Sequence, residues 1–587
     1  MASHRFPIYI SDKVLFVSGV ISLLGLTFDF GFKDSYWSHL ITDFVYLIYG
    51  GIATISYMQS VKFDFKSGIK GIHVVVILSV LLLFLALANT YYFLYNEDKS
   101  LNFYTALLVF ILIMFDLSGR LYALDRQTLH PALVFVLSFL VLIFVGTLLL
   151  LTPNATVNGI GFIDALFTST SAVCVTGLAT LNTGQDFTRL GQWVIMFLIQ
   201  FGALGMLSFT SLFALLFKGF GSFESRLVLK NMINANSLEN IFKTLIQIIV
   251  LVVTIEAIGA AFIFYSNDVS FDSLNDKLFF SVFHSISAFC NAGFSTLSDS
   301  LYESNYRHNY NLQLVIAVLI ILGGLGYGVM INIYHLGKGT AKNLLYKWLK
   351  KPITQKDRVQ LNLSLNTKIV IFTSLCLIIL GGVLFYLLEY NNSLKEHSAF
   401  GKVVTALFGS ITTRTAGFNT VDTSALTMST IMIILFLMWI GASPGSTGGG
   451  IKTTTFAVAS LNIYQQVFGF KHLRVGWKVI EQGALHRATS IISLSLIMIG
   501  LSTFLLVTID GHLGLMPLAF EVFSAYSTVG LSMGITAELS VAGKLVLVLT
   551  MFIGRVGFLT LLTGMVRQVV SYKYSPIEYP EEQIFIN

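Results

Sequence analysis

The stretch SAVCVTGL (171–178) recurs three times further along the chain, as SAFCNAGF (287–294), TRTAGF (413–418) and SAYSTVGL (524–531). Aligned on one glycine, the four copies share Gly177, Gly293, Gly417 and Gly530, which are separated by 116, 124 and 113 residues. A second glycine cluster begins 25, 30, 24 and 24 residues later: GALGM (202–206), GGLGY (323–327), GASPGSTGGG (441–450) and GRVGF (554–558). Because two markers keep their register in four copies, the sequence predicts a fourfold internal repeat.

The amino-acid composition is that of a helical protein embedded in a membrane. Of the 587 residues, 55% are hydrophobic and 11% are charged, whereas soluble domains carry ~25% charged residues. With only three cysteines, the chain is not a secreted module built on disulfides. The sequence therefore predicts an all-α polytopic membrane protein.

The apolar segments fall into two length classes. A bilayer-crossing helix needs ~20 mostly apolar residues, and twelve segments qualify: roughly 14–30, 40–58, 72–95, 101–122, 131–152, 190–217, 241–265, 311–337, 367–390, 426–468, 488–510 and 541–570. Four shorter segments, about 160–174, 277–289, 399–412 and 515–527, each run into one of the glycine motifs. Such segments are typical of half-helices that enter a membrane and turn back.

The repeat unit is therefore a span, a half-helix, a glycine loop and a second span. We expect residues 1–125 to form about four extra N-terminal transmembrane helices. Four pore repeats are then predicted, the third with a broken second helix and the fourth with the C-terminal tail: 126–235, 236–350, 351–475 and 476–587.

Lysine and arginine gather on one side of this twelve-span topology, together with both termini. The segment 338–368 holds eight of them, whereas 153–189 on the opposite side holds only Arg189. Cytoplasmic loops of membrane proteins are enriched in these residues, so both termini are predicted to be cytoplasmic. The net charge of +6 is thus interpreted as topology rather than nucleic-acid binding. Segments 338–368 and 218–240 are predicted to dock a cytoplasmic partner, with contact to anionic lipid as the alternative.

Physical chemistry links the glycine loops to cations. A half-helix that ends inside the membrane points the negative end of its dipole inward, which favours a cation there. The carbonyl groups of the following loop are tolerated at that depth only where they line a cavity or a pore. Rings of such carbonyls replace the hydration shell of a cation, and glycine allows the positive φ that aims them at one axis. Four copies in one chain would enclose one pore.

These residues resemble a known family of transport proteins. The triplets VTG, NAG, TAG and TVG are similar to the filter sequences of the Trk/Ktr/HKT superfamily, and GGLGY, SPGSTGGGIKTTT, IGRVGFLTLL and YPEEQIFIN resemble later parts of its bacterial pore-forming subunits. The resemblance covers about 131–587. It implies a selectivity filter whose backbone carbonyls hold potassium and which consists of Val175, Thr176, Gly177, Asn291, Ala292, Gly293, Thr415, Ala416, Gly417, Thr528, Val529 and Gly530.

The resemblance also implies a function and partners. It implies potassium uptake through a channel-like pore in the cell (inner) membrane, by a homodimer. A cytoplasmic ring of TrkA/KtrA type would regulate the pore, so nucleotide is expected only on that separate subunit and no cofactor in this chain. Glycine at all four filter positions favours potassium, since plant members with serine at the first position can favour sodium.

The glycine-rich segment 441–450 breaks the long apolar segment 426–468. It lacks the contiguous Gly-Lys-Ser/Thr of a phosphate-binding loop, and three successive glycines cannot hold a stiff helix. By resemblance it is an intramembrane gating loop, and Arg555 is a gating arginine in the middle of the membrane. The predicted gating residues are Gly445, Gly448, Gly449, Gly450, Lys452 and Arg555.

Other charged residues within apolar segments have structural interpretations. Arg414 is expected to brace its loop from behind, because a cation lining the filter would repel the substrate. Asp164 is expected to cap a half-helix. His284 and Glu521, each nine residues before a motif glycine, are expected to brace, and Glu256 is a costly intramembrane charge that needs a partner.

Two further functional classes remain as alternatives. One is a secondary carrier coupled to sodium or protons, since broken helices at matched positions are also typical of carriers. The other is a sodium-permeable member of the same superfamily. An enzyme is not expected, because the chain has no His-Glu-x-x-His motif.

Overall fold

We analysed a computed structural model, which describes residues 10–32, 36–64, 70–96, 104–105, 108–109, 112–113, 131–205, 241–267, 269, 271, 273–348, 363–470, 473–475, 478–559 and 562. The basic segment 218–240, all of 349–362 and the C-terminal tail lie outside these residues. The predictions that concern them therefore stay predictions.

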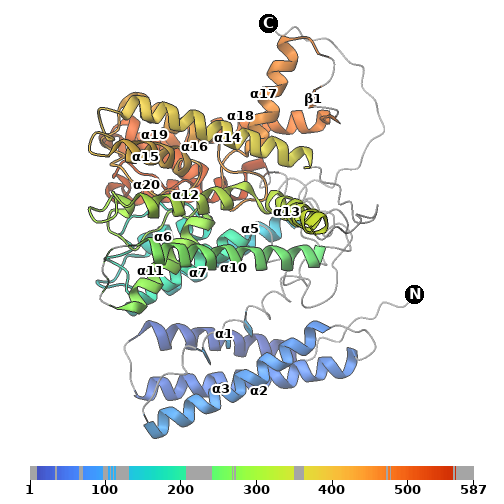
Figure 1. Ribbon diagram of the computed structural model, residues 1–587. Helices are drawn as coiled ribbons and strands as arrows, with labels where there is room; N and C mark the ends of the chain where they lie inside the picture. Colours follow the sequence, from blue (N-terminus) through green and yellow to red (C-terminus); the bar gives the residue numbers. More distant parts are fainter. Residues whose placement is uncertain are drawn as a thin grey trace, which may run out of the picture.

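The N-terminal helices form a layer of their own beside the rest of the molecule (Figure 1). They are α1 (Ile10–Gly31), α2 (Tyr36–Asp64) and α3 (Lys70–Asn96). A separate hydrophobic cluster joins them, with Leu15, Tyr46 and Leu82 among its buried members. Leu108, Val109, Leu112 and Ile113 belong to the same cluster, so the described part of the expected segment 101–122 packs with these helices. The rest of that segment lies outside the described residues.

The remaining helices follow the predicted repeat order. The first group is α5 (Pro131–Leu150), α6 (Phe162–Cys174) and α7 (Arg189–Gly205); the second is α10 (Ile241–Ser266), α11 (Leu274–Cys290), α12 (Tyr310–Leu325) and α13 (Tyr327–Trp348). The third is α14 (Leu365–Glu389), α15 (Ala399–Thr412), α16 (Met428–Trp439) and α17 (Thr453–Val467); the fourth is α18 (Gln482–Asp510), α19 (Leu515–Ser527) and α20 (Val541–Val556). Short connections are η1 (Pro153–Ala155), η2 (Ser300–Tyr302), η3 (Gly511–Leu513), η4 (Thr536–Glu538) and an antiparallel pair of strands, β1 (Arg474–Val475) and β2 (Lys478–Val479).

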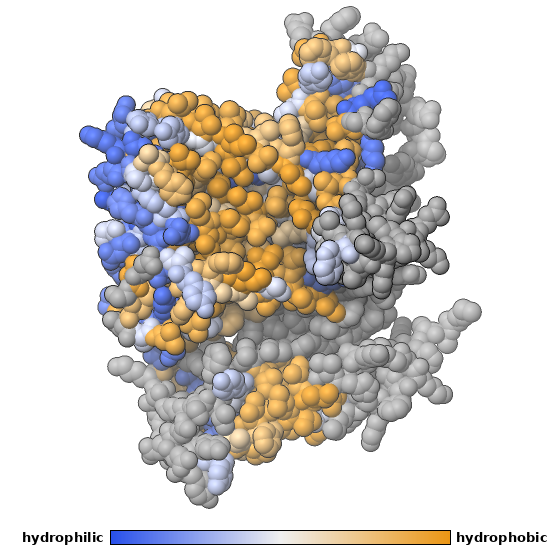
Figure 2. Space-filling model, viewed as in Figure 1, coloured by the Kyte–Doolittle hydropathy of each residue, from blue (hydrophilic) through white to orange (hydrophobic). Residues whose placement is uncertain are grey.

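The surface of this helical body is a broad apolar band with a polar rim at the loop end (Figure 2). Among the described residues, four helices are long and apolar enough to cross a membrane, within Leu40–Tyr57, Ile246–Ser266, Leu365–Glu389 and Gln482–Leu513. The bent pair α12–α13 would add a fifth, and most of the other expected spans coincide with shorter apolar helices. The structure is thus a polytopic helical membrane fold.

The span expected at 311–337 is not one continuous helix. The structure breaks it at Gly326, where α12 and α13 meet at an angle of 103°. Gly326 has φ +87°, and a Cβ there would lie 2.5 Å from the carbonyl oxygen of Pro444. The freed amide of Tyr327 donates to the carbonyl of Gly445 at 2.9 Å. The second repeat therefore has a broken second helix, as the third does, because a distant loop satisfies the backbone at the bend.

The second glycine marker explains how each second span packs on its half-helix. A Cβ at Gly202, Gly323 or Gly554 would collide with a backbone carbonyl, that of Val173, Phe289 or Tyr526 respectively. Each of these carbonyls lies four residues before the motif glycine of the same repeat. In the third repeat the corresponding Gly441 instead meets the carbonyl of Gly449. In the third repeat, this glycine therefore packs against the repeat's own broken segment, whereas in the other three it packs against the end of the half-helix.

Candidate functional site

Each half-helix is followed by a non-glycine residue with left-handed backbone conformation, which is the C-cap itself in three repeats. Val175, Asn291 and Thr528 are the C-caps of α6, α11 and α19, with φ of 58°, 60° and 50°. Thr415 after α15 has φ 74°. The next residue has negative φ and the motif glycine again has positive φ, so the sign alternates along all four loops. Non-glycine residues rarely adopt positive φ, so the backbone of these loops is strained and is held in place by the surrounding structure.

The four motif glycines form a closed ring. A Cβ built on Gly293 would lie 3.1 Å from the Cα of Gly417 and 2.7 Å from the carbonyl oxygen of Ala416. In the same way, a Cβ on Gly417 would lie 3.1 Å from the Cα of Gly530, and one on Gly530 would lie 2.9 Å from the Cα of Gly177. A Cβ on Gly177 would lie 3.1 Å from the Cα of Gly293, which closes the circle. Four loops separated by more than a hundred residues in sequence thus meet around one axis.

The other candidate filter residues turn their side chains into the protein. Val175, Thr176, Asn291, Ala292, Thr415, Ala416, Thr528 and Val529 are all fully buried. Val175 and Ala292 belong to one hydrophobic cluster, Ala416 to a second and Val529 to a third. Because these four side chains are held in clusters away from the ring, we expect backbone groups to face its axis.

Hydroxyl groups at the ends of the half-helices hold the loops in place. Ser171 accepts from the amide of Gly177 at 3.1 Å, and Ser524 accepts from the amide of Gly530 at 3.0 Å. Ser287 donates to the carbonyl of Phe294 at 2.7 Å. Thr412 donates to the carbonyl of Phe418 at 2.6 Å. Sequence analysis missed these residues, although a serine opens three of the four aligned motifs.

His284 and Glu521 contact the chain just beyond their motif glycines. Nε2 of His284 lies 2.9 Å from Oγ of Ser295, and Nδ1 lies 2.9 Å from the carbonyl of Phe280. Glu521 accepts hydrogen bonds from the hydroxyl of Ser532 at 2.5 Å and of Thr536 at 3.0 Å. Ser295 and Ser532 both lie two residues after the glycine, so the two side chains have equivalent bracing contacts.

The broken segment of the third repeat lies directly against two of the loops. A Cβ on Gly448 would collide with Oγ1 of Thr415, and one on Gly449 with Oγ1 of Thr528. The amide of Gly449 donates to Oγ1 of Thr528 at 3.0 Å. The glycines thus have a steric role, because they let this segment pack against the first residues of the third and fourth loops.

Two positively charged side chains donate hydrogen bonds to carbonyl groups of this segment. Lys452 donates from Nζ to the carbonyl of Gly448 at 2.6 Å. Arg555, of which 2% is exposed, donates to the carbonyl of Thr447 and, at 2.8 Å, to that of Gly202 on α7. Arg555 therefore ties the fourth repeat to the first repeat and to the broken segment of the third.

Part of the broken segment also matches the Gly-x-Ser-x-Gly pattern of serine hydrolases. The pattern runs from Gly441 to Gly445 and centres on Ser443. However, the hydroxyl of Ser443 accepts a hydrogen bond from Thr453 at 3.1 Å. A nucleophilic serine needs an adjacent general base, and threonine cannot act as one. The match therefore gives no reason to expect an enzyme.

The remaining intramembrane charges have polar partners. Arg414 points away from the ring and donates to the carbonyl of Ser374 at 3.3 Å and to its hydroxyl at 3.2 Å, on α14. Glu256 accepts from Gln200 at 3.2 Å and contacts the thiol of Cys290, which identifies the partners that the sequence left open. A buried charge without such partners would be strongly destabilising.

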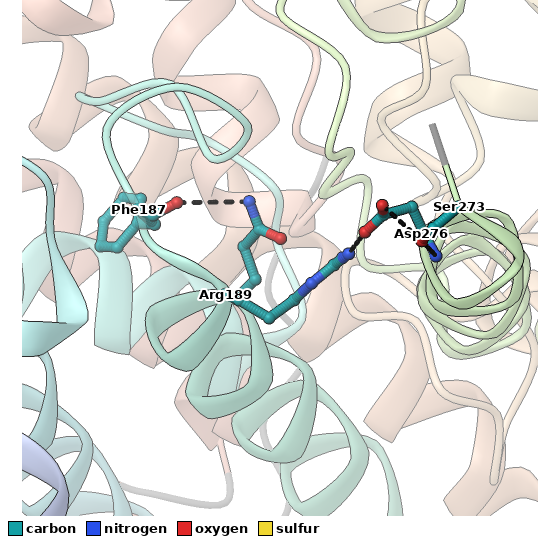
Figure 3. A network of polar contacts seen from close by, with 5 residues as sticks. Phe187, Arg189, Ser273 and Asp276 are labelled. Atoms are coloured by element: carbon teal, nitrogen blue, oxygen red, sulfur yellow. Dashed lines mark hydrogen bonds and ion pairs between the residues drawn. The ribbon is translucent and has the colours of Figure 1, made fainter. Parts of the chain in front are cut away.

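Ion pairs join neighbouring repeats at the end of the molecule where the half-helices begin. Arg189 at the start of α7 pairs with Asp276 on α11, and Asp276 also accepts from Ser273 at 2.7 Å (Figure 3). Lys544 on α20 pairs with Asp164 on α6 at 2.8 Å. Gly161 rather than Asp164 is the N-cap of α6, so the expected cap is wrong and Asp164 instead links the fourth repeat to the first.

Comparison with known proteins identifies the family. The family model TrkH, cation transport protein, matches residues 103–575. The chain is 36% identical to the potassium/sodium uptake protein NtpJ of Enterococcus hirae, covering 78% of this chain and 98% of that protein. It is 34% identical to the Ktr system potassium uptake protein B of Bacillus subtilis, covering 78% and 96%.

The fold also matches the solved structure of a potassium transporter. The crystal structure of the potassium transporter TrkH from Vibrio parahaemolyticus aligns with a TM-score of 0.59 and 17% sequence identity, over 94% of this chain and 98% of that chain. The four loops around one axis and the apolar surface agree with what the family model and the relatives above 30% identity indicate. The chain belongs to the TrkH family of cation transport proteins.

Proposed function

We propose that this chain forms a potassium-selective pore whose filter is the ring of four glycine loops. The observation that carries the proposal is the closed circle of Gly177, Gly293, Gly417 and Gly530. Alternating φ signs point successive carbonyls to one side, and carbonyl oxygens arranged around an axis replace the hydration shell of a cation. The names of NtpJ and of the Ktr proteins, which are potassium uptake proteins, support potassium as the transported ion.

The broken segment and Arg555 would act as the gate. The segment lies against Thr415 and Thr528 at the inner ends of two filter loops, and Arg555 and Lys452 hold its carbonyls there. A positive charge next to the pore raises the barrier to another cation. The proposed gating residues are those predicted from the sequence: Gly445, Gly448, Gly449, Gly450, Lys452 and Arg555.

The same proposal covers the topology of the chain, its assembly and its partner. Residues 126–235, 236–350, 351–475 and 476–587 would be the four pore repeats, preceded by extra helices in 1–125, with twelve spans and both termini in the cytoplasm. The chain would assemble as a homodimer in the cell membrane. Because three relatives are named as members of Ktr systems, we expect a separate nucleotide-binding regulatory subunit on the cytoplasmic side.

A sodium-permeable pore is the second candidate, since NtpJ is named a potassium/sodium uptake protein. One experiment separates the two. The purified chain in liposomes should take up potassium and rubidium faster than sodium when a membrane potential is the only driving force. A Gly177→Ser variant should assemble normally but lose part of this preference, because its side chain would collide with the next loop. Equal uptake of sodium and potassium by the unmodified chain would favour the second candidate, and uptake only with a sodium or proton gradient would indicate a carrier.

A further inference from the structure

Two histidines meet at the boundary between the second and third repeats. His308 lies in the segment before α12, and His397 lies in the segment before α15. The centroids of their imidazole rings are 5.2 Å apart, and the ring planes are inclined by 60°. Neither side chain belongs to the proposed filter or to the proposed gate.

The ring separation suits a tetrahedral metal ion. Zinc binds histidine nitrogen at about 2.0–2.1 Å, which puts the centre of each ring roughly 3.2 Å from the metal. A tetrahedral angle between two such ligands then separates the ring centres by roughly 5.2 Å. The separation of the two rings therefore matches that of two ligands on one ion.

We propose that His308 and His397 form a binding site for a transition-metal dication such as Zn²⁺, which would bridge the second and third repeats. Tyr310 supports the site, since its hydroxyl oxygen lies 3.2 Å from Nδ1 of His397. When the imidazole carries its proton on Nδ1, that N–H donates to Tyr310 and Nε2 is left to bind metal. Metal-binding histidines commonly have such a hydrogen-bonded partner on the second nitrogen.

A groove beside His308 gives the ion access and leaves room for water ligands, whereas His397 is buried behind this lining, with 8% of the residue exposed. An open groove of about 670 Å³ runs along His308, Tyr310 and Phe400, and Asn305 and Asn309 add polar groups to its lining. Water molecules in this groove could complete the coordination. Among the described residues, no group of three or more His, Cys, Asp and Glu is placed to hold a metal. With two protein ligands, binding should be weaker than at a four-ligand structural zinc site.

The nearby charges are already paired or engaged. Arg307 forms an ion pair with Glu396 at 2.9 Å, so its charge is largely compensated beside the site. Lys402 donates to the carbonyl of Tyr390 at 3.2 Å and lies over the ring of the same residue. The ion pair therefore reduces repulsion between a dication and Arg307, whereas Lys402 keeps its charge and weakens the binding of a dication.

The position of the site suggests an effect on transport. The ring of Tyr310 packs against Gly401 in the first turn of α15, the third half-helix. A bound ion would tie the two repeats together there and add two positive charges near the start of a half-helix that leads to the ring of glycines. If the proposed function holds, Zn²⁺ should lower cation uptake.

Calorimetric titration of the purified full-length chain with ZnCl₂, after removal of any affinity tag, tests the site itself. We expect one zinc per chain in the unmodified protein and at least tenfold weaker binding in His308→Ala and His397→Ala. Tyr310→Phe, which keeps both ligands, should weaken binding by roughly tenfold. His512→Ala is the matched control, because His512 lies in η3 just before the fourth half-helix, and it should bind zinc as the unmodified chain does. His308 is exposed, so its replacement should leave folding intact.

Unchanged zinc binding in both His308→Ala and His397→Ala would overturn the site. A separate uptake measurement in liposomes tests its effect, and this arm rests on the proposed function. Zinc should reduce rubidium uptake by the unmodified chain and by His512→Ala, but not by His397→Ala. If zinc binds at the histidines and uptake is unaffected, the effect on transport is refuted while the site stands. If the unmodified chain takes up no cation at all, the proposed function fails and the calorimetric result is unaffected.

Discussion

Removal of Arg555 should open the pore in the absence of any regulatory subunit. The guanidinium is buried and donates to the carbonyls of Thr447 and Gly202. Only the first of these bonds holds the broken segment; the second joins α20 to α7. Arg555→Ala therefore frees the segment on the side where it would close the proposed pore, and it also removes a positive charge next to that pore.

The size of the effect follows from the single bond that is lost. A hydrogen bond to a charged group contributes about 1.5–3 kcal/mol. If that energy favours the closed arrangement alone, its loss raises the population of the open arrangement by roughly 10- to 150-fold, since about 1.4 kcal/mol corresponds to a factor of ten. The bonds of Lys452 to Gly448 and of Gly449 to Thr528 remain, so the segment should loosen rather than unfold.

The assay is potential-driven rubidium uptake by liposomes that contain the purified chain. Arg414→Ala is a matched control, because Arg414 is another buried arginine, in the third repeat, and its hydrogen bonds go to Ser374 on α14 rather than to the broken segment. Uptake should rise at least tenfold in Arg555→Ala and not in Arg414→Ala, with little change in the preference for potassium. Uptake at the unmodified level in folded Arg555→Ala would mean that Arg555 is only a structural brace.

Two other substitutions and one double-mutant cycle test further parts of the same structure. Gly293→Ala puts a Cβ 2.7 Å from a neighbouring loop carbonyl at a residue with φ +72°, which costs about 1–2 kcal/mol in backbone conformation alone. The ratio of rubidium to sodium uptake should therefore fall while the protein still folds. Gly554→Ala should lower the free energy of unfolding by about 1–3 kcal/mol, because α20 must move away from a half-helix carbonyl. A thermal unfolding midpoint equal to that of the unmodified protein would contradict this packing. The pair of Arg189 and Asp276 is nearly half exposed, so a double-mutant cycle on unfolding should give a coupling energy below about 1 kcal/mol.

Much of the architecture could be predicted from the sequence because apolar length and glycine position are local signals. The half-helix expected at 399–412 is α15 (Ala399–Thr412), and the one expected at 160–174 is α6 (Phe162–Cys174). The shared register of the motif glycines also predicted that four loops belong together, which agrees with the ring that they form. Features that depend on the residues of a segment itself, such as the bounds of a half-helix, could therefore be predicted.

Features that depend on distant partners could not be predicted in this way. The bend at Gly326 was missed because a glycine in an apolar segment is usually tolerated within a straight helix. The bonds that stabilise the break come from a distant segment: Tyr327 donates to Gly445, and Gly324 accepts from Ser443. Asp164 looked like a helix cap because Lys544, its partner, lies 380 residues away. The partners of Glu256 come from two other helices, so no pattern within its own segment pointed to them.

The most direct test of the account is to locate the ion. Crystals of the chain grown in rubidium chloride and measured at the rubidium absorption edge would show bound ions by their anomalous scattering. The account predicts rubidium on the axis enclosed by Gly177, Gly293, Gly417 and Gly530, within reach of the carbonyls of the four loops, and a weaker peak there in Gly417→Ser. Ordered loops with rubidium bound elsewhere in the membrane region, and none within the ring, would contradict the claim that these loops form the filter.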